Sequence, residues 1–442
     1  MELSSYRNIW RVAYPIIIGS VAQNLMNLAD TAFLGQLGSE ELAASGNAII
    51  FYFLFIVVGI GFSIGAEIVV GRRNGEGNYP EIGRVVDHCF YILIPLSLIL
   101  YLTYQVFGQS ILEAVTANET IVGIGLQYLD FRVYGIFFAF MNLCFRTFYI
   151  GTTNTSILIW STSIMAVVNI AFDYLLIFGN LGFPELGVKG AAIASVIAEV
   201  SALIYFSVYT LKNVDLQKYR LLAFGAIELK IWRNLFKVSL PIMLQHFIAI
   251  ASWLFFFLII EKMGTKELAI SHIVRSIYMV LMIPLFGFSA ATSTLVSNLI
   301  GQNQHEGVMA FTWKVSKLTL LATALILPMN LLFPEKMISF FTSDPEILQG
   351  SVSVIYVITA SMFAFSLAFI LFSAVSGTGN TQISLLIETS TLVIYVATAY
   401  SIVFVLDGSL PIVWCSEFVY FGLMGLFSFF YLRYGNWRNR VI

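Results

Sequence analysis

Charge is scarce in this sequence. Asp, Glu, Lys and Arg make up 11% of the 442 residues, and the formal net charge is −2. Because a soluble domain carries roughly 25% charged residues, this content excludes an ordinary soluble protein. The balance of signs also leaves no basic surface for nucleic acid. Cysteine is equally scarce: Cys89, Cys144 and Cys415 each lie in an apolar run without C-x-x-C spacing, which indicates neither a disulfide framework nor a zinc site.

Catalytic motifs are absent as well. The chain has no H-x-x-x-H, H-E-x-x-H, G-x-S-x-G or Walker motif, and Gly75-Glu76-Gly77 reads as a loop between apolar segments. We therefore predict that the chain is not an enzyme and needs no cofactor. Without a nucleotide site, any transport would draw its energy from an ion gradient.

Apolar residues, in contrast, account for 59% of the chain. A helix that crosses a bilayer needs about 20 of them in succession, and twelve such runs stand between polar breaks. Their approximate limits are 8–34, 42–71, 85–107, 120–147, 153–178, 186–211, 234–261, 267–298, 309–333, 346–375, 380–405 and 411–434. They predict an all-α polytopic membrane protein with twelve transmembrane helices.

Basic residues gather in alternate loops, which sets the expected orientation. Cytoplasmic loops of membrane proteins carry an excess of Lys and Arg. In this chain such residues are Arg7, Arg11, Arg72, Arg73, Arg84, Lys212, Lys218, Arg220, Lys230, Arg233, Arg433, Arg438 and Arg440. We therefore expect a multi-pass protein of the inner (cytoplasmic) membrane with both termini in the cytoplasm.

The sequence repeats itself at a fixed offset. Residues 7–15 reappear as 233–241, so the offset is 233 − 7 = 226. Further pairs at this offset are 37–45 with 263–271, 61–63 with 287–289, and 151–155 with 377–381. Each half holds six predicted spans, an even number, so the copies should be parallel and enclose a central cavity. The expected parts of this monomer are an N-lobe (1–211), a cytoplasmic linker (212–233) and a C-lobe (234–442).

Three polar side chains share one face of the first apolar segment. Gln23, Asn27 and Asp30 are spaced i, i+4 and i+7, which brings them together on a helix. A carboxylate at membrane depth costs several kcal/mol unless it faces protein, water or an ion. Asp30 is therefore a candidate functional residue; the structural alternative is an Asp at the membrane interface.

A second acid, Asp173, follows Asn169 by one helical turn, and Ser195 lies among small residues in the next span. With Asp30 they offer two carboxylates, an amide and a hydroxyl, which are hard oxygen ligands suited to Na⁺. Two nearby acids in a dry site could instead hold a proton. We therefore expect a Na⁺ or H⁺ site made of Asp30, Asn169, Asp173 and Ser195. Ordinary interhelical hydrogen bonding is the alternative for Asn169 and Ser195.

The repeat copies the scaffold but not these residues. At the offset of 226 residues, the counterparts of Asp30, Asn169 and Asp173 are Phe256, Tyr395 and Ala399. A structural role should have survived in both halves, whereas an ion site is needed only once. The difference favours a functional role for the residues of the first half.

The second half has a polar set of its own. Its candidate cavity-lining or gating residues are Gln245, His246, His272, Arg275 and Glu388. Arg275 could pair with Glu388, because an unpaired charge inside a membrane is costly; a purely structural buried ion pair is the alternative. Acids near predicted helix ends, expected to be solvated, are Glu67, Glu199 and Glu261.

Several motifs together resemble the multidrug and toxic compound extrusion (MATE) family. They are Asp30-Thr31, the Leu-Gly-x-x-x-Leu-Ala pattern from Leu37 to Ala43, Gly151-x-x-Asn154-Thr155, Asn169-x-x-x-Asp173 and Gly187-x-x-Gly190-Ala-Ala-x-Ala-Ser195. The resemblance covers nearly the whole chain. It implies an antiporter that exports amphipathic, often cationic, drugs in exchange for Na⁺ or H⁺ by alternating access.

Within this family the chain looks closer to the DinF-like bacterial branch. That branch places a cation or proton site on an Asp in helix one, an Asn and an Asp in helix five and a Thr in helix six; Ser195 keeps the hydroxyl of that Thr. The NorM branch carries acids in helices seven and ten, and none stands near Gln245–Ile250 or inside the tenth span after its opening residues. A flippase for lipid-linked oligosaccharides is the alternative within the superfamily. It would need several bases inside the spans, where Arg132, Arg146 and Arg275 are the candidates.

Overall fold

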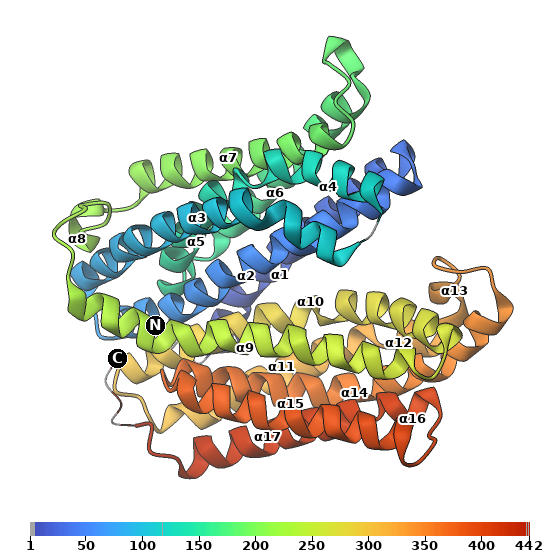
Figure 1. The fold of residues 1–442 in the computed structure, drawn as a ribbon. Coiled ribbons are helices and arrows are strands. Elements are labelled where there is room, and N and C mark those ends of the chain that lie inside the picture. The colour runs from blue at the N-terminus through green and yellow to red at the C-terminus, as the bar shows by residue number, and fades with distance from the viewer. Residues whose placement is uncertain (1–4, 117, 439, 441) are drawn as a thin grey trace. The chain divides into compact units, whose positions relative to one another are not determined.

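The computed structural model describes residues 5–116, 118–438, 440 and 442, and its regular elements there are helices. Figure 1 shows the long helices of each half running side by side. In chain order they are α1 (Tyr6–Leu37), α2 (Ser39–Gly75), α3 (Tyr79–Val115), α4 (Glu119–Arg132), α5 (Gly135–Gly151), α6 (Ser156–Phe178), the 3₁₀ turn η1 (Asn180–Gly182), α7 (Val188–Asn213), α8 (Leu216–Tyr219), α9 (Leu229–Glu261), α10 (Thr265–Gly301), α11 (Gly307–Ile326), α12 (Pro328–Leu332), α13 (Pro334–Ile338), α14 (Pro345–Gly377), α15 (Thr381–Phe404), α16 (Leu410–Trp414) and α17 (Ser416–Tyr434).

Eleven helices within the described residues are long and apolar enough to cross a membrane, or up to twelve if the bent pair α4 and α5 counts as one span. The count agrees with the predicted twelve spans. The fourth span is not straight, because α4 and α5 meet at 48°. At the break, the Tyr134 N–H donates to the Phe131 carbonyl, three residues back, instead of continuing the α-helical pattern. Gly135 then begins α5.

The chain forms two compact units. The N-terminal unit contains Tyr14–Ser239, and the C-terminal unit contains Leu240–Ile442 together with Met1–Ala13. Thus α1 and α9 each pass from one unit to the other at the residue before a proline, Pro15 or Pro241. The two crossing points obey the repeat, since 240 − 14 = 226.

These limits differ from the expected lobes at both starts. Residues 1–13 were expected in the N-lobe and 234–239 in the C-lobe, but each set belongs to the other unit. Equivalent ring contacts show why. Trp10 packs on Phe288 in the C-terminal unit, and its counterpart Phe236 packs on Phe62 in the N-terminal unit, both with centroids 5.9 Å apart. The repeated segment at the start of each half therefore attaches the first turns of α1 and of α9 to the unit formed by the other half.

Each unit contains the same hydrogen bond between two side-chain hydroxyl groups. Ser63 on α2 hydrogen-bonds Thr147 on α5 at 2.9 Å between their hydroxyl oxygens. The counterparts Ser289 and Ser373 hydrogen-bond at 2.6 Å between α10 and α14. The same helix pair is thus joined at the same place in both units, as expected for a duplicated scaffold.

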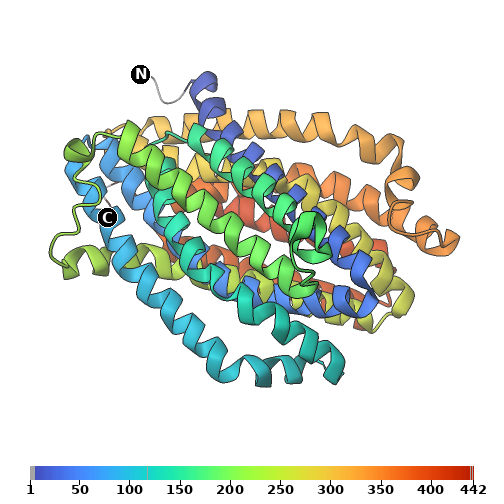
Figure 2. The same cartoon turned by 90° about the horizontal axis from the view of Figure 1, so that it is seen from above.

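The helices α6 and α7 pack tightly against each other, and Figure 2 shows α7 in green running beside α6. Gly190 makes this approach possible, because a Cβ there would overlap the Leu176 carbonyl. The turn between the two helices is closed by the Leu186 N–H, which donates to the Leu176 carbonyl at 2.8 Å. This packing sets the distance between the polar residues of α6 and those of α7.

The expected linker contains one short helix, α8, and is held against α3. Both carboxylate oxygens of Asp87 accept backbone N–H groups, from Leu222 at 2.8 Å and from Phe224 at 2.9 Å. His88 Nε2 accepts the N–H of Glu228 at 2.9 Å. The linker is therefore part of the N-terminal unit.

Candidate functional site

The four residues predicted to bind an ion come together in the N-terminal unit. Asn169 and Asp173 are fully buried on α6, and Ser195 faces them from α7. The Asn169 Nδ2 group donates to Ser195 Oγ at 3.4 Å. Asp30, on α1, lies close enough to Asp173 and Asn169 for their side chains to interact. Three helices therefore contribute to one polar site in an otherwise apolar bundle.

The oxygen atoms of this site have few partners. Among the described residues, Asp30 Oδ1, Asn169 Oδ1 and both carboxylate oxygens of Asp173 are buried and accept no hydrogen bond. A buried acceptor without a partner costs about 1–3 kcal/mol, and more if it is charged. Two carboxylates that approach in a dry site repel each other unless a proton or a cation lies between them. The arrangement is thus suited to holding H⁺ or a small cation.

The donor set limits which cation would fit. The described residues include no group of three or more His, Cys, Asp or Glu side chains suited to a metal ion. Two carboxylates with an amide oxygen and a hydroxyl form a weaker, all-oxygen set, which fits a monovalent ion such as Na⁺ better than a transition metal. Such a set would hold an ion that enters and leaves.

Gln23 and Asn27 lie on the same face of α1, as their spacing predicts. Gln23 Nε2 donates to Asn27 Oδ1 at 3.3 Å, and Asn27 is exposed while Gln23 is half-buried. They precede Asp30 by one to two turns on that face. Their participation in the ion site stays a prediction.

Glu199 belongs to the surroundings of the site, and the expectation that it is solvated is wrong. It is 9% exposed and forms a two-pronged ion pair with Arg132, at 2.7 Å and 3.1 Å. Arg132 comes from the last turn of α4, 67 positions away in sequence. The sequence does hold one signal for Glu199: it follows Ser195 by four residues, so the two share a face of α7.

Glu67 was also expected to be solvated and is not. It is 1% exposed, accepts a hydrogen bond from Ser63 at 3.3 Å, and lies 3.6 Å from Arg146 Nε. Glu261, in contrast, is exposed at the end of α9, as predicted. Hydropathy places these acids near span ends, but burial depends on which helix covers them.

The counterparts of the site in the C-terminal unit meet as well. Phe256 on α9 and Tyr395 on α15 stack with centroids 5.2 Å apart and an interplanar angle of 25°. Ala399, the counterpart of Asp173, is fully buried one turn further on. The repeat therefore brings the same positions together in both units, but only the N-terminal unit places acids there.

The expected pairing of Arg275 with Glu388 is wrong. Arg275 and His272 both lie against the Phe257 ring, at 5.0 Å and 4.8 Å, which confirms their shared helical face. Glu388 instead accepts a hydrogen bond from the Tyr420 hydroxyl at 3.0 Å, and no ion pair of Arg275 occurs among the described residues. The Phe257 ring partly stabilises the Arg275 charge through a cation–π interaction.

A buried acid of the C-terminal unit was missed by the sequence analysis. Glu417 is 3% exposed and accepts hydrogen bonds from Tyr395 at 3.0 Å and from Tyr278 at 3.3 Å. It lies in the first turn of α17, beside a polar break, where an acid at the membrane interface is common. Gln245 Nε2 and His246 Nε2 are buried without a partner among the described residues.

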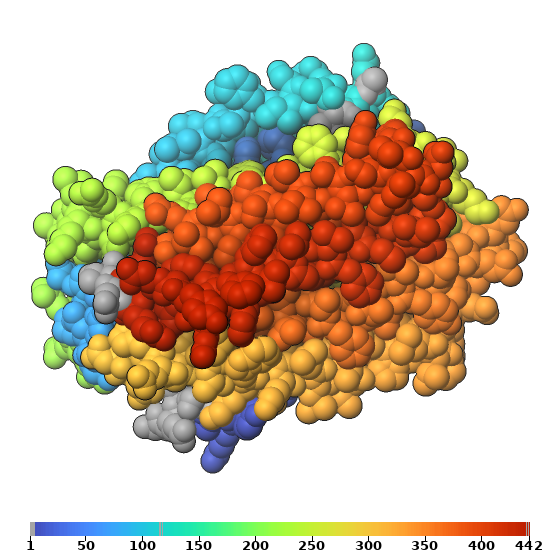
Figure 3. Space-filling view, turned by 90° about the horizontal axis from the view of Figure 1, so that it is seen from below, coloured from blue at the N-terminus to red at the C-terminus, as the bar shows by residue number. Residues whose placement is uncertain are grey.

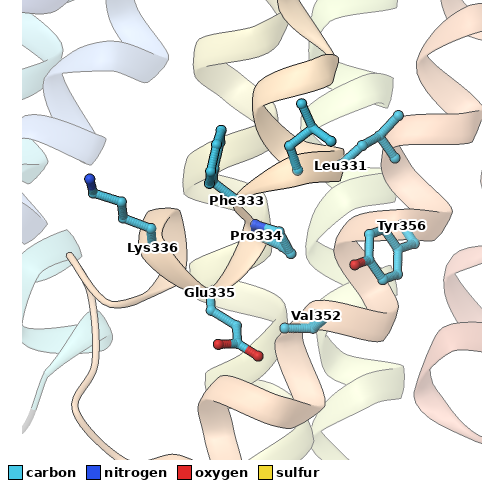
Figure 4. Close-up of a pocket in the computed structure, with 8 residues that line it drawn as sticks. Leu331, Phe333, Pro334, Glu335, Lys336, Val352 and Tyr356 are labelled. Carbon is cyan, nitrogen blue, oxygen red and sulfur yellow. The ribbon is translucent and has the colours of Figure 1, made fainter.

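The surface of the C-terminal unit includes a face formed by two long helices and, elsewhere, a pocket. Figure 3 shows one face of the C-terminal unit, on which residues of α15 and α17 form the orange and red surface. Figure 4 shows a pocket between α12, α13 and α14, lined by residues that include Leu331, Phe333, Glu335 and Tyr356. None of the predicted site residues lines this pocket.

Comparison with known proteins finds similarity along most of the chain. The MatE family model matches residues 15–175 and 241–401, twice and at the offset of the repeat, since 241 − 15 = 226. The "Probable multidrug resistance protein NorM" of Thermotoga maritima is 27% identical over 393 residues, which are 85% of this chain and 80% of that protein.

Two solved structures share the fold. One, described as an outward-facing conformation of a multidrug resistance MATE family transporter of the MOP superfamily, aligns with a TM-score of 0.90 at 21% identity, over 96% of this chain and 94% of that one. A MOP superfamily transporter from Pyrococcus furiosus, described as having a binding pocket of reverse polarity that suggests a different function, aligns with a TM-score of 0.88 at 20% identity over the same shares. The predicted fold, an all-helical multi-pass membrane protein, is confirmed.

Proposed function

We propose, from the premise that this chain belongs to the MatE family, that it is a cation-coupled antiporter that exports amphipathic, often cationic, drugs. As a member of a transporter family it is not an enzyme. The observation that carries the proposal is the group of Asp30, Asn169, Asp173 and Ser195, where four buried oxygen atoms have no partner among the described residues. The name of the Thermotoga relative supports drug export.

Coupling follows from the electrostatics of the two acids. A proton or Na⁺ between Asp30 and Asp173 would hold α1 against α6, whereas two bare carboxylates would repel each other and favour separation of the helices. An ion can shift this equilibrium only by its difference in affinity for the two states. To move it from 1:99 to 99:1, the preference must reach about 10⁴-fold. The protein, as a monomer, would then alternate between inward-open and outward-open states.

The position of the acids supports a DinF-like mode of coupling. They belong to the first half of the repeat, on α1 and α6. The second half has buried acids too, Glu388 and Glu417, but they lie on its last two long helices, α15 and α17, and hydrogen-bond to tyrosines. The distribution of Arg and Lys in the loops supports cytoplasmic termini.

The flippase alternative loses support from the ion pairs. A cavity for a lipid-linked pyrophosphate needs bases that are free to bind phosphate. Arg132 is paired with Glu199, and Arg146 lies beside Glu67. Arg275 alone of the three candidates has no acid within ion-pair distance among the described residues, which is too little positive charge for such a ligand.

Transport in proteoliposomes tests the proposal. Ethidium movement would be measured under an imposed Na⁺ gradient and, separately, under an imposed pH gradient. We expect one gradient to drive transport in the wild type and neither to do so in Asp30→Asn. The matched control is Asp130→Asn, which makes the same change at an exposed acid of the same unit and should keep activity. Full activity of Asp30→Asn would refute the site, and an inactive wild type would refute drug export.

A further inference from the structure

Arg132 is the best-restrained charged side chain near the ion site. Its Nη2 and Nη1 atoms donate to the two carboxylate oxygens of Glu199, at 2.7 Å and 3.1 Å. The guanidinium carbon also lies 3.9 Å from the centre of the Tyr52 ring, and the Tyr52 hydroxyl donates to Glu199 at 3.5 Å. Three helices, α2, α4 and α7, thus hold one cation inside the bundle.

This cation is near one acid of the ion site, Asp30. Arg132 lies near enough to Asp30 for their charges to interact. Tyr128, one turn earlier on the same face of α4, is buried within range of the charges of Asp30, Asp173 and Glu199. The ion site and the ion pair therefore form one electrostatic cluster, with Tyr128 adjoining both.

The backbone leaves room for this cluster. A Cβ on Gly135, the first residue of α5, would overlap Arg132 Nη1 and Glu199 Oε2. The 48° bend between α4 and α5 falls in the same place. The break in the fourth span and the glycine after it thus make space for the ion pair.

The pair is absent from the duplicated half. Tyr52 has its counterpart in Tyr278, 226 residues on, but the counterpart of Arg132 is Ile358, a buried apolar residue. The guanidinium occurs only in the unit that has the two acids. A cation needed just for helix packing would not follow that distribution.

We infer that Arg132 is a tethered counter-ion of the Asp30–Asp173 pair, and that Glu199 and Tyr52 are positioning residues that restrain it. This inference rests on the proposed antiport function and adds residues to the same site. While Glu199 holds the guanidinium, the two acids keep most of their negative charge for an external cation. If the guanidinium were released, it would turn to the acids and compete with that cation.

Charge counting explains why the tether is needed. The cluster contains three carboxylates and one guanidinium, so the carboxylates can take up further positive charge. An opposite charge within a few ångströms strongly stabilises a carboxylate, and it does so whether it comes from solution or from Arg132. The strength of the Arg132–Glu199 contact therefore sets the affinity of the site for the driving cation.

Variants of the pair give predictions of opposite sign. Glu199→Gln frees Arg132, so the driving-cation concentration that gives half-maximal ethidium transport should rise about tenfold or more. In the double variant Arg132→Gln with Glu199→Gln the competing cation is gone, and the same concentration should fall below that of the wild type. The KM for ethidium should change little in either.

Two further variants keep the test decisive. Tyr52→Phe removes one hydroxyl and keeps the ring, so it should fold even if Glu199→Gln does not, and should raise the half-maximal concentration about two- to threefold. The matched control is Glu67→Gln with Arg146→Gln, which removes another contact between a buried acid and an arginine of this unit and should leave that concentration unchanged.

The outcomes separate this inference from the function. Changes of the same sign in the single and double variants, or a change in the control of equal size, would overturn the role of Arg132 while transport itself stands. A wild type that responds to neither gradient would overturn the proposed function and, with it, this inference. Opposite shifts with an unchanged control would establish the tethered counter-ion.

Discussion

The two units place the same three positions side by side and fill them with opposite chemistry. In the N-terminal unit the positions are Asp30, Asn169 and Asp173, with four oxygen atoms that lack partners among the described residues. In the C-terminal unit the counterparts are Phe256, Tyr395 and Ala399, and the two rings stack with centroids 5.2 Å apart. The same backbone therefore supports a polar site in one unit and a packed apolar core in the other.

This difference teaches which residues the fold needs. The ring contacts of Trp10 with Phe288 and of Phe236 with Phe62 occur in both units, as do the hydroxyl links between the second and fourth spans of each half. These duplicated contacts hold the bundle together. The acids are not duplicated, and the C-terminal unit is well packed without them, so stability does not explain their presence.

The largest effect is expected from putting an acid into the apolar unit. Ala399→Asp would bury a carboxylate beside Phe256 and Tyr395 with no cation to balance it, and such a charge costs several kcal/mol. We expect loss of the folded protein, measured as the yield of monodisperse protein in detergent. Ala399→Ser, which adds a smaller and neutral polar group, should retain most of that yield. A stable Ala399→Asp would show that the C-terminal unit also tolerates an ion site.

The reverse exchange should abolish coupling but not folding. Asp173→Ala gives the N-terminal unit the residue of its counterpart and removes two buried oxygen atoms that lack partners. Replacing such a group by an apolar one is often neutral or stabilising, so the melting temperature should stay equal or rise. Gradient-driven ethidium transport should fall to background. Transport at the wild-type rate would contradict the role of Asp173.

A smaller effect is expected at the hydroxyl of the site. Ser195→Ala removes the acceptor of the 3.4 Å hydrogen bond from Asn169 and one ligand of the proposed cation. The net value of one such interaction is about 1 kcal/mol, which corresponds to a roughly fivefold higher half-maximal concentration of the driving cation. Ser195→Thr keeps the hydroxyl and should stay within about twofold of the wild type. Equal effects of both substitutions would point to packing instead.

The smallest effect is expected at the linker, which belongs to the N-terminal unit alone. Arg84 forms an ion pair with Glu228, and this hydrogen bond lowers the pKa of Glu228 below its usual value of 4.5. A lowered pKa means that the contact stabilises the docked linker above pH 4.5 and is lost as the pH falls through the lowered value. Because the Glu228 side chain is partly exposed, solvent screens the contact and the change should be slight.

Hydrogen exchange measures this change directly. Amides of residues 222–228 should exchange slightly faster, relative to a reference peptide, below the pKa of Glu228 than at pH 6. Glu228→Gln removes the titrating group but leaves Asp87 and His88 in place, so it isolates the contribution of Glu228. An identical pH response in wild type and Glu228→Gln would assign the effect to those neighbours.

The grouping of the candidate ion-site residues was largely predictable because its signals are local. Asn169 and Asp173 are one turn apart, and an acid inside an apolar run stands out against the cost of burying it. The comparison with Phe256, Tyr395 and Ala399 needed only the offset of the repeat. All of these signals lie within a segment or between its two copies.

The residues around the site were not predictable in the same way. Glu67 and Glu199 were expected to be solvated because they lie near the ends of predicted spans. Hydropathy along the chain gives the distance from a polar break, but it does not tell which helix covers a side chain. The partner of Glu199 comes from another helix, 67 positions away. Likewise Arg275 was expected to pair with Glu388. Instead Arg275 lies over the Phe257 ring, and Glu388 accepts a hydrogen bond from Tyr420.

The sequence by itself determined the helical class, the number of spans, the repeat and the polar faces, because each follows from periodicity along the chain. Only the tertiary structure decided how α1, α6 and α7 bring their polar faces together. It also decided that α1 and α9 begin in the opposite unit, and that Gly135 makes room for Arg132 beside Glu199. The physical reason is that contacts between helices depend on crossing angle and register, which are set by the packing of whole helices and not by any one segment.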